Sequence, residues 1–505
     1  MTALGITGDA LTLTDIREVA VEYRPVLLSP EVATRVAASR RMVDQYLAEE
    51  RPVYGVTTGF GRFSDVLIDA HHRRMLQENL LRSHAAGVGP PFPPAVSRAM
   101  ILLRVNALAK GFSGVRMALV EQLVNFLNRG VTPVVPSQGS VGASGDLAPL
   151  AHLALVVMGE GTAWVDGNVR PAGEALARAG LVALPLEAKE GLALINGTQA
   201  MTAVGALTAE RAEQLADWAD IAAALSVEVL RGIPRAYDPK VAAVRPHPGQ
   251  ELVGRHLRHL LRDSRLTTDP GEIRLQDAYS LRCVPQVHGA GRDGLAHVAE
   301  VLRREANSVT DNPLLFAESD TVISAGNFHG QPVALVLDYL GIILAEWADI
   351  SERRVERMVN PALSGLPPFL VAQGGLNSGL MLAQYTAASL VSENKVWAHP
   401  ASVDSIPTSA NQEDHVSMGM TAARKAWTIA QNLEAVLAIE LLCAAQAAEF
   451  LGPHLLAPRT RAVYRFVRSL VPAWTVDRWL APDIEAVRAA LSSSAARDVA
   501  RSVLP

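Results

Sequence analysis

Long stretches of the chain repeat apolar residues at the spacing of buried helices. Their period is close to 3.6 residues, which is the period of an α-helix. The apolar positions are too dense for a single stripe on a surface helix, so these helices are expected to pack on several sides in a bundle. The pattern therefore predicts a mainly α fold with a long central helical bundle, with helices at residues 202–232, 292–308, 332–358, 379–392 and 419–451.

The N-terminal region has shorter elements, separated by turns rich in glycine and proline. Residues 95–128 have helical spacing that is interrupted at Gly111–Gly114. Val32–Glu50 is expected to form an amphipathic helix, and Thr14 is expected to cap a helix that starts near Asp15.

The sequence contains no repeat, low-complexity tract or flexible linker between these parts. We therefore expect one intertwined fold rather than independent domains. Its regions are an N-terminal region at 1–200, a central bundle at 201–450 and a C-terminal helical segment at 451–505.

Composition excludes several classes of protein. A net charge of −5 over 505 residues argues against a surface that binds nucleic acid. The two cysteines, Cys283 and Cys443, lie far apart and outside any metal-binding spacing, which is typical of reduced thiols in the cytoplasm. The N-terminus lacks the basic and apolar parts of a signal peptide. Charged residues interrupt the apolar helices, so no membrane span is expected.

One histidine pair raises the question of a metal site. His256 and His259 are three residues apart, but Arg255, Arg258 and Arg262 surround them. Because three arginines repel a cation, we expect a solvated basic helix face here and no bound metal.

The most informative stretch is Gly-Ala-Ser-Gly-Asp-Leu-Ala-Pro-Leu at residues 142–150. In a tight turn, the amide nitrogen of Gly145 can attack the carbonyl carbon of Ala143 and close a five-membered ring. Loss of two waters then leaves an exocyclic methylidene derived from the Cβ of Ser144. Gly145 suits this role because it has no Cβ to keep its nitrogen away. A helix that begins at Asp146 would direct its positive dipole end at the ring.

Two other loop chemistries fit the stretch poorly. A phosphate-binding loop requires a lysine that is missing here. A hydrolase nucleophile elbow requires glycine where Asp146 stands.

The stretch resembles the signature of the aromatic amino acid ammonia-lyases and aminomutases. Enzymes of this family carry the ring, 4-methylideneimidazole-5-one (MIO), as a built-in prosthetic group. Other separated motifs agree, so the resemblance covers nearly the whole chain. It implies an ammonia-lyase/fumarase-like architecture in which a smaller N-terminal region carries the MIO loop and a lid. It also implies a homotetramer in which each active site draws on three chains.

The resemblance assigns roles to four N-terminal positions. Tyr54, in the glycine-rich run Val53–Gly61, matches the lid tyrosine that removes the β-proton, although an isolated tyrosine there would be an aromatic plug. Ser83 and His84 match the pair that contacts the substrate ring, although a histidine near a helix C-terminus is also favoured by the dipole. Asn196 matches the asparagine that holds substrate and ring, although such a residue is usually a turn former.

A second group of positions follows in the C-terminal half. Tyr279 and Arg282 are three residues apart and share a helix face, where the arginine would otherwise be a surface residue. By resemblance, Arg282 holds the substrate carboxylate in a bidentate pair, Tyr279 handles amine and ring, and Gln276 belongs to the same binding cluster. Phe328 matches a residue that packs near the ring.

Glu413 indicates the substrate. Most loop glutamates are solvated carboxylates, but histidine-specific members of the family carry Glu at this position, and tyrosine-handling members carry a neutral residue. A carboxylate suits an imidazole N–H and is awkward beside a phenol. The resemblance therefore implies elimination of ammonia from L-histidine to give trans-urocanate, the first step of histidine degradation. An alkaline activity optimum is also expected, because a tyrosine base must be ionised.

Three other functions stay open. The nearest is a tyrosine or phenylalanine ammonia-lyase, or an aromatic 2,3-aminomutase, that uses the same MIO group. A non-catalytic binding scaffold of the same fold is the second. The third is a metal-dependent hydrolase, for which the sequence offers no ligand cluster.

Overall fold

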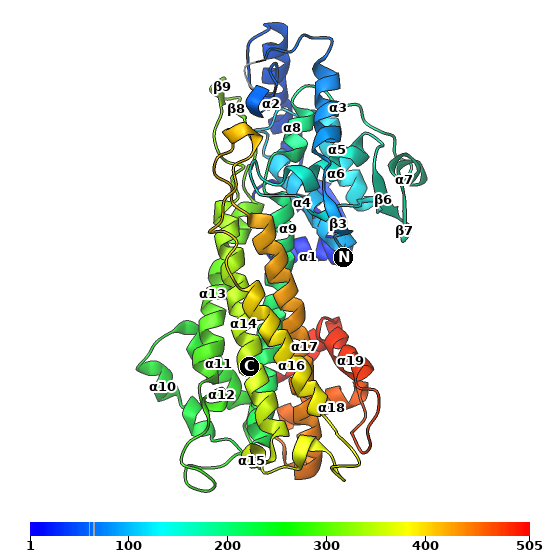
Figure 1. Ribbon diagram of the computed structural model, residues 1–505. Helices are drawn as coiled ribbons and strands as arrows, with labels where there is room; N and C mark the ends of the chain where they lie inside the picture. The colour runs from blue at the N-terminus through cyan, green and yellow to red at the C-terminus, as the bar shows by residue number, and fades with distance from the viewer. Residues whose placement is uncertain (60, 64–65) are drawn as a thin grey trace. The chain divides into compact units, whose positions relative to one another are not determined.

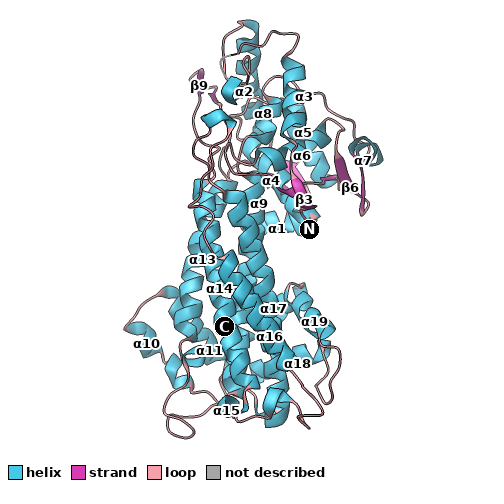
Figure 2. Cartoon of the chain, in the orientation of Figure 1, coloured by secondary structure: helices cyan, strands magenta, loops and turns pink. Residues whose placement is uncertain are grey.

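Helices dominate the computed structural model, which describes residues 1–59, 61–63 and 66–505 (Figures 1 and 2). The mainly α fold expected from the apolar pattern is confirmed. The chain forms two compact units. Unit 1 comprises Met1–Glu210, Ala299–Asp338 and Pro400–Arg424, and unit 2 comprises Arg211–Val298, Tyr339–His399 and Lys425–Pro505. Four of the five unit boundaries fall inside long helices, namely α9 (Gln199–Val229), α13 (Val284–Ala306), α14 (Gln331–Val359) and α17 (Gly419–Leu451), and the fifth falls between His399 and Pro400. The three regions expected from the sequence stay a prediction.

Unit 1 combines helices with short strands. Its helices are α1 (Leu13–Val21), α2 (Pro30–Ala48), α3 (Arg73–His84), α4 (Pro94–Ala109), α5 (Met117–Asn128), α6 (Leu147–Val157), α7 (Ala172–Arg178) and α8 (Glu190–Ile195), with 3-10 turns η1 (Gly61–Phe63) and η4 (Ser409–Asn411). Its strands are β1 (Leu4–Ile6), β2 (Val26–Leu28), β3 (Val88–Pro91), β4 (Thr132–Pro133), β5 (Pro136–Gln138), β6 (Thr162–Val165), β7 (Asn168–Pro171), β8 (Leu314–Phe316) and β9 (Thr321–Ile323).

The strands of unit 1 pair into small sheets of two or three strands. β1 pairs parallel with β2, whereas β3–β5, β4–β6–β7 and β8–β9 are antiparallel. The core helix α4 is buried on all sides from Val96 to Ala109, as its dense apolar pattern requires.

The cap expected at the first helix is wrong by two residues. Thr12, not Thr14, caps α1, because its hydroxyl accepts from the backbone N–H of Asp15 and the Asp15 carboxylate accepts from the N–H of Thr12. This capping box satisfies two amide donors at once, so the helix begins at Leu13.

Unit 2 is almost wholly helical. Besides its parts of the long helices it contains α10 (Pro239–Ala243), α11 (Pro248–Leu260), α12 (Tyr279–Arg282), α15 (Pro361–Ser364), α16 (Met381–Trp397), α18 (Pro458–Leu470), α19 (Ala481–Leu491) and α20 (Ser494–Val503), with 3-10 turns η2 (Pro234–Tyr237), η3 (Pro368–Leu370) and η5 (Pro453–Leu455). Buried polar contacts join its helices. Arg354 on α14 donates to Glu440 on α17 at 2.5 Å, and Asn432 on α17 donates to Asn394 on α16 at 2.8 Å.

The solvated basic face expected around His256 and His259 is wrong for His256, although Arg255 and Arg262 are exposed. His256 is only 6% exposed, and its Nδ1 lies 2.9 Å from the Asp220 carboxylate. Asp220 also binds Nδ1 of His288 at 2.7 Å and the guanidinium of Arg292. A buried carboxylate needs such partners, and the sequence around His256 gives no sign of a residue 36 positions away.

From the sequence, neither a metal site nor a membrane-spanning helix was expected. Within the described residues, no group of three or more histidine, cysteine, aspartate or glutamate side chains is arranged to hold a metal ion. No helix in the described parts of the chain is long and apolar enough to span a bilayer.

Candidate active site

The Ala143–Gly145 turn is packed so closely that only small residues fit. Gly145 has φ +71°, and a Cβ there would lie 2.1 Å from the carbonyl oxygen of Gly197. Gly142 has φ +70°, and a Cβ there would lie 2.2 Å from Oγ of Ser417. Glycine alone accepts both the left-handed backbone and the close approach. The turn therefore needs glycine at both positions, which agrees with the small residues expected for ring closure.

Asp146 fastens the turn to the start of α9. Its carboxylate accepts from the hydroxyl of Ser140 at 2.9 Å and from the N–H of Met201 at 2.7 Å. Its own N–H donates to the carbonyl of Gly197 at 2.7 Å. Burial raises the pKa of Asp146 to about 7, although these hydrogen bonds oppose the rise. Asp146 is also the N-cap of α6, so the turn lies at the positive end of that helix, as expected from the sequence.

Asn196 reaches the turn from the end of α8. Its side-chain Nδ2 donates to the carbonyl oxygen of Ser144 at 3.1 Å. Asn196 is 3% exposed, and its Oδ1 has no hydrogen-bond partner among the described residues. An unpaired buried oxygen beside the turn is a group that an incoming N–H would satisfy.

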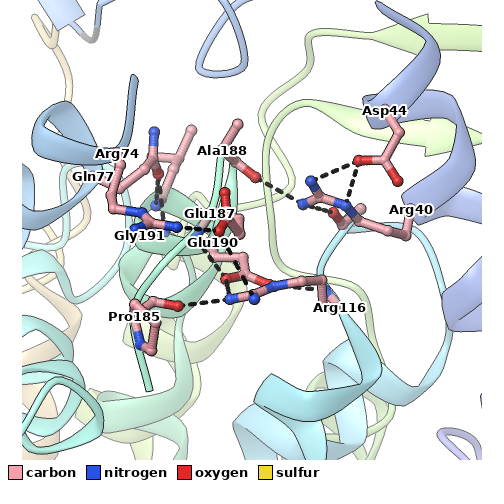
Figure 3. A network of polar contacts seen from close by, with 12 residues as sticks. Arg40, Asp44, Arg74, Gln77, Arg116, Pro185, Glu187, Ala188, Glu190 and Gly191 are labelled. Carbon is pink, nitrogen blue, oxygen red and sulfur yellow. Dashed lines mark hydrogen bonds and ion pairs between the residues drawn. The ribbon is translucent and has the colours of Figure 1, made fainter. Parts of the chain in front are cut away.

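A polar network holds α8 in place (Figure 3). The buried Glu190 at the start of the helix accepts from the guanidinium of Arg116 at 2.6 and 2.8 Å. The next residue, Gly191, donates its N–H to the side chain of Gln77 at 2.9 Å. Because α8 has only six residues, the network at its start also sets where Asn196 emerges at its end.

The other end of α8 is held by a buried cation. Arg104 on α4 donates to the carbonyls of Ala193 and Asn196 at 2.8 and 3.0 Å, and to the side chain of Gln199. All three acceptors are neutral, and burial lowers the Arg104 pKa to about 10. Arg104 thus places a positive charge beneath the segment that carries Asn196.

Glu413 approaches the turn on a short strained loop. Ser409, Ala410 and Asn411 all have positive φ, between 51° and 65°. The loop is closed by two backbone hydrogen bonds between Thr408 and Glu413. One Glu413 oxygen accepts from the Ser144 hydroxyl at 3.0 Å, and the other accepts from the Thr408 hydroxyl at 2.8 Å.

These groups surround a cavity of about 410 Å³ within unit 1. Apolar side chains from α3, α6 and α8 form much of its wall, and the polar groups converge on Ser144. The lining residues are Tyr54, Gly61, Phe63, Leu80, His84, Ser144, Leu147, Leu192, Ile195, Asn196, Ser409, Ala410 and Glu413. Apolar walls with a few convergent polar groups are typical of a site for a small organic ligand.

Burial shifts the two titratable rings in opposite directions. Burial raises the pKa of Tyr54, and the negative charge of Glu413 adds to the rise, whereas the N–H that Gly61 donates to the Tyr54 hydroxyl at 3.2 Å opposes it. Burial lowers the pKa of His84, which favours its neutral form. Nδ1 of His84 lies 3.0 Å from the Ser83 hydroxyl.

The structure thus brings Tyr54, His84, Asn196 and Glu413 around Ser144, with Ala143 and Gly145 in the turn itself. Ser83 is exposed, and Phe328 is half-buried; neither lines the cavity among the residues described for it.

Gln276, Tyr279 and Arg282 belong to unit 2 and are absent from the described lining. Tyr279 is 71% exposed, and the guanidinium of Arg282 stacks 4.7 Å from its ring centre, so the expected shared helix face is confirmed. Their roles in binding stay a prediction.

Sequence reasoning missed much of the apolar wall of the cavity, as well as two polar residues that position the site. Nothing in the sequence indicates a role for Thr408, which is only a hydroxyl-bearing residue five positions before Glu413. Arg104 stands in an apolar helical run, where a charged residue with full burial is rare enough to indicate a buried partner.

Comparisons with known proteins agree with this geometry. A family model described as aromatic amino acid lyase matches residues 11–469. The chain is 62% identical to a histidine ammonia-lyase from Symbiobacterium thermophilum over 95% of both chains. It superposes on a crystal structure of histidine ammonia-lyase from Trypanosoma cruzi with a TM-score of 0.93 at 44% identity, covering 100% of this chain and 96% of the other. For a tyrosine aminomutase from Streptomyces globisporus the TM-score is 0.96 at 40% identity, covering 100% of this chain and 99% of the other.

Proposed function

Because the chain belongs to the aromatic amino acid lyase family, we propose that it eliminates ammonia from L-histidine to give trans-urocanate. We propose further that its electrophile is MIO, formed from Ala143, Ser144 and Gly145. The tight turn, the small residues and the unpaired oxygen of Asn196 fit that group. When formed, MIO would supply an electrophilic carbon that takes up the substrate amine.

The observation that carries the choice of substrate is the Glu413 carboxylate in the cavity beside Ser144. An imidazole ring offers an N–H donor that a carboxylate accepts strongly, whereas a phenyl ring offers none. A phenol also has an O–H that a carboxylate accepts, so Glu413 by itself separates imidazole substrates from phenyl ones, and the comparison of histidine with tyrosine below tests the phenol. His84, whose lowered pKa favours a neutral ring, adds a second hydrogen-bonding group without repelling an imidazole.

The remaining residues hold the substrate and move the proton. The free Oδ1 of Asn196 accepts an N–H of the substrate, while its Nδ2 keeps the Ser144 carbonyl in place. Tyr54 lies in the cavity wall and takes the β-proton as general base. The positive end of α6 and the buried guanidinium of Arg104 favour negative charge that develops at the turn.

We propose that other copies of the chain complete each site in a homotetramer. Arg282 would hold the substrate carboxylate, Tyr279 and Gln276 would contact amine and ring, and Phe328 would pack near the ring. Exposed apolar side chains on two helices of unit 2 support an assembly, because such faces are costly in water. They are Tyr339 and Ile342 on α14, and Leu382, Tyr385, Val396 and Trp397 on α16.

A cytoplasmic location completes the proposal. Cys283 and Cys443 are both unpaired, as expected where thiols stay reduced.

Product analysis tests the function directly. Purified protein given L-histidine should produce urocanate, followed by its ultraviolet absorbance, and should produce no coumarate from tyrosine or cinnamate from phenylalanine. Formation of β-amino acids or of coumarate in preference to urocanate would overturn the choice of substrate.

Mixing two inactive variants tests the shared site. Tyr54→Phe and Tyr279→Phe proteins, unfolded and refolded together, should regain part of the activity, because some mixed sites contain neither substitution. Activity that stays at the level of the separately refolded variants would contradict sharing.

A further inference from the structure

One buried glutamine joins the two helices that carry His84 and Asn196. Gln77 on α3 is fully buried, and its Oε1 accepts the backbone N–H of Gly191 at 2.9 Å and that of Leu192 at 3.4 Å (Figure 3). We infer that Gln77 is a positioning residue, which sets the spacing between His84 and Asn196 and thereby aligns the two ends of the substrate. This inference rests on the proposed function, because it requires that both residues contact the same substrate.

Gln77 supplies the cap that α8 lacks. The N-cap residue Lys189 has φ +73°, and its side chain caps no N–H of the helix. The first N–H groups of a helix have no partner within it, so their acceptors must come from elsewhere. Oε1 of Gln77 accepts from two of them, although it belongs to a different helix. The start of α8 is therefore tied directly to α3.

The backbones of the two helices approach closely at the same place. A Cβ at Gly191 would lie 2.9 Å from the carbonyl oxygen of Gln77 and 2.9 Å from its Oε1. Only glycine, which has no Cβ, permits this approach without a shift of one helix. Hydrogen bonds and close packing thus fix one point of contact, and neither helix can slide along the other without losing it.

Both site residues lie on rigid extensions of this contact. His84 is seven residues beyond Gln77 on α3, which is almost two turns, so the two side chains share a face with Leu80. At 1.5 Å per residue, His84 lies about 10 Å along α3 from Gln77, and Asn196 lies about 7 Å along α8 from Gly191. His84, Leu80 and Asn196 all line the cavity. A shift at the Gln77 contact therefore changes the distance between His84 and Asn196.

The amide of Gln77 is present at a cost to stability. Its Nε2 is buried and has no hydrogen-bond partner among the described residues. An unpaired buried donor is destabilising, so a side chain that only filled space here would better be apolar. Within the described residues, the hydrogen bonds of this amide go to the start of α8. The amide is thus explained by the placement of α8 rather than by packing.

The spacing matters because the substrate must be held at both ends. In the proposed function, His84 contacts the imidazole ring and the Oδ1 of Asn196 accepts an N–H of the substrate. Only when both contacts form together does the β-carbon lie at a fixed place relative to Ser144 and Tyr54. A misplacement of about 1 Å at such a site can cost about 100-fold in rate.

Steady-state kinetics of Gln77→Met test the inference. Methionine has a similar volume but offers no acceptor to the N–H groups of α8. We expect KM for L-histidine to rise about tenfold and kcat to fall about tenfold, because the two contacts no longer fit one substrate together. A purely structural role would lower the amount of folded enzyme, and with it the apparent kcat, but would leave KM unchanged.

The possible outcomes separate the inference from the proposed function. An unchanged KM in Gln77→Met, with wild-type protein that forms urocanate, would overturn the inference alone. Wild-type protein that forms no urocanate would overturn the proposed function.

A double-mutant cycle with His84→Ala gives a second readout. Without the ring contact the spacing no longer matters, so Gln77→Met should raise KM by less than about twofold in the His84→Ala background. The same tenfold rise in both backgrounds would show that the two residues act independently and would contradict the inference.

Gln122→Met is the matched control. Gln122 on α5 is also buried, and its Nε2 donates to the carbonyl of Val182 at 2.9 Å; neither residue is among those described for the cavity. Its replacement should lower the stability in urea and leave KM unchanged. An equal rise of KM in Gln122→Met and Gln77→Met would contradict a specific role.

A second variant keeps the test decisive if Gln77→Met fails to fold. Gly191→Ala leaves Gln77 intact and favours the helix, but its methyl group enters the close contact between α8 and α3. The helices must move apart, so KM should rise by at least about threefold. A wild-type KM in Gly191→Ala would contradict the dependence on spacing. Circular dichroism and size-exclusion chromatography establish that each variant is folded.

Discussion

The side-chain Nδ2 of Asn196 donates a hydrogen bond to the carbonyl oxygen of Ser144 over 3.1 Å. One short helix thereby connects the buried network at Glu190 to the atoms of the proposed electrophile. The other end of the same side-chain amide remains available to a ligand, because Oδ1 lies beside the cavity and has no hydrogen-bond partner among the described residues. Catalytic geometry at Ser144 thus depends on residues that never touch a substrate.

Replacing Asn196 with alanine should lower kcat by about 100-fold, because loss of one donor at a site of developing charge has that size. Steady-state kinetics of urocanate formation measure the effect. Asn168→Ala, at the exposed start of β7, is the matched control and should leave kcat unchanged. An unchanged kcat in Asn196→Ala would remove this residue from the mechanism.

Breaking the buried pair at the start of α8 should destabilise the fold. Glu190→Gln removes the nearer and buried of the two carboxylates that face the Arg116 guanidinium, and leaves only Glu187 at 4.0 Å, at an expected cost of about 3 kcal/mol in the free energy of unfolding. Glu187→Gln removes a half-exposed pair with Arg74 in the same network and should cost less than about 1 kcal/mol (Figure 3). Urea unfolding of both variants decides whether burial sets the difference, and equal losses would contradict it.

Arg104→Met should impair both stability and turnover. Methionine fills similar volume but leaves the carbonyls of Ala193 and Asn196 without their donor, at about 1–3 kcal/mol each. If Arg104 acts only as a structural support, kcat of the folded fraction would be unchanged; we expect it to fall by at least tenfold, because the positive charge beneath the turn is lost. Arg304→Met, at an exposed ion pair on α13, is the control.

The stability of the protein should depend on the protonation of Asp146. Burial raises its pKa to about 7, whereas the unfolded chain has an aspartate pKa of about 4. Its stabilising contribution is therefore fully present below pH 4 and is lost as the pH rises through about 7. Asp146→Asn removes this dependence, so the variant should gain stability relative to wild type between pH 4 and 7, by up to about 4 kcal/mol. A difference in unfolding free energy that is constant with pH would contradict the raised pKa.

The structural features that can be predicted from the sequence are those set by local residue patterns or by resemblance to a family. Helical spacing predicts the buried helix α4, and the small residues around Ser144 predict a tight turn. Partners that meet only after folding are not encoded locally. Nothing near Arg104 points to the carbonyl of Ala193, 89 residues away, and nothing near Asp220 points to His256. The arginines that flank His256 along the sequence predicted a solvent-exposed histidine. The prediction failed because these arginines point elsewhere on the helix.

Tyr54 should impose a rising dependence of activity on pH. Burial and the charge of Glu413 raise the pKa of its hydroxyl above the ordinary value near 10, so only a small fraction is ionised at neutral pH. A base acts in its deprotonated form, and kcat/KM should therefore increase by up to about tenfold per pH unit below that pKa. Tyr54→Phe should reduce kcat by about 10²- to 10⁴-fold, whereas Tyr23→Phe, at an exposed position, should not. Rates of urocanate formation from pH 6 to 10 test this. A profile that stays flat down to acidic pH would show that another group removes the β-proton.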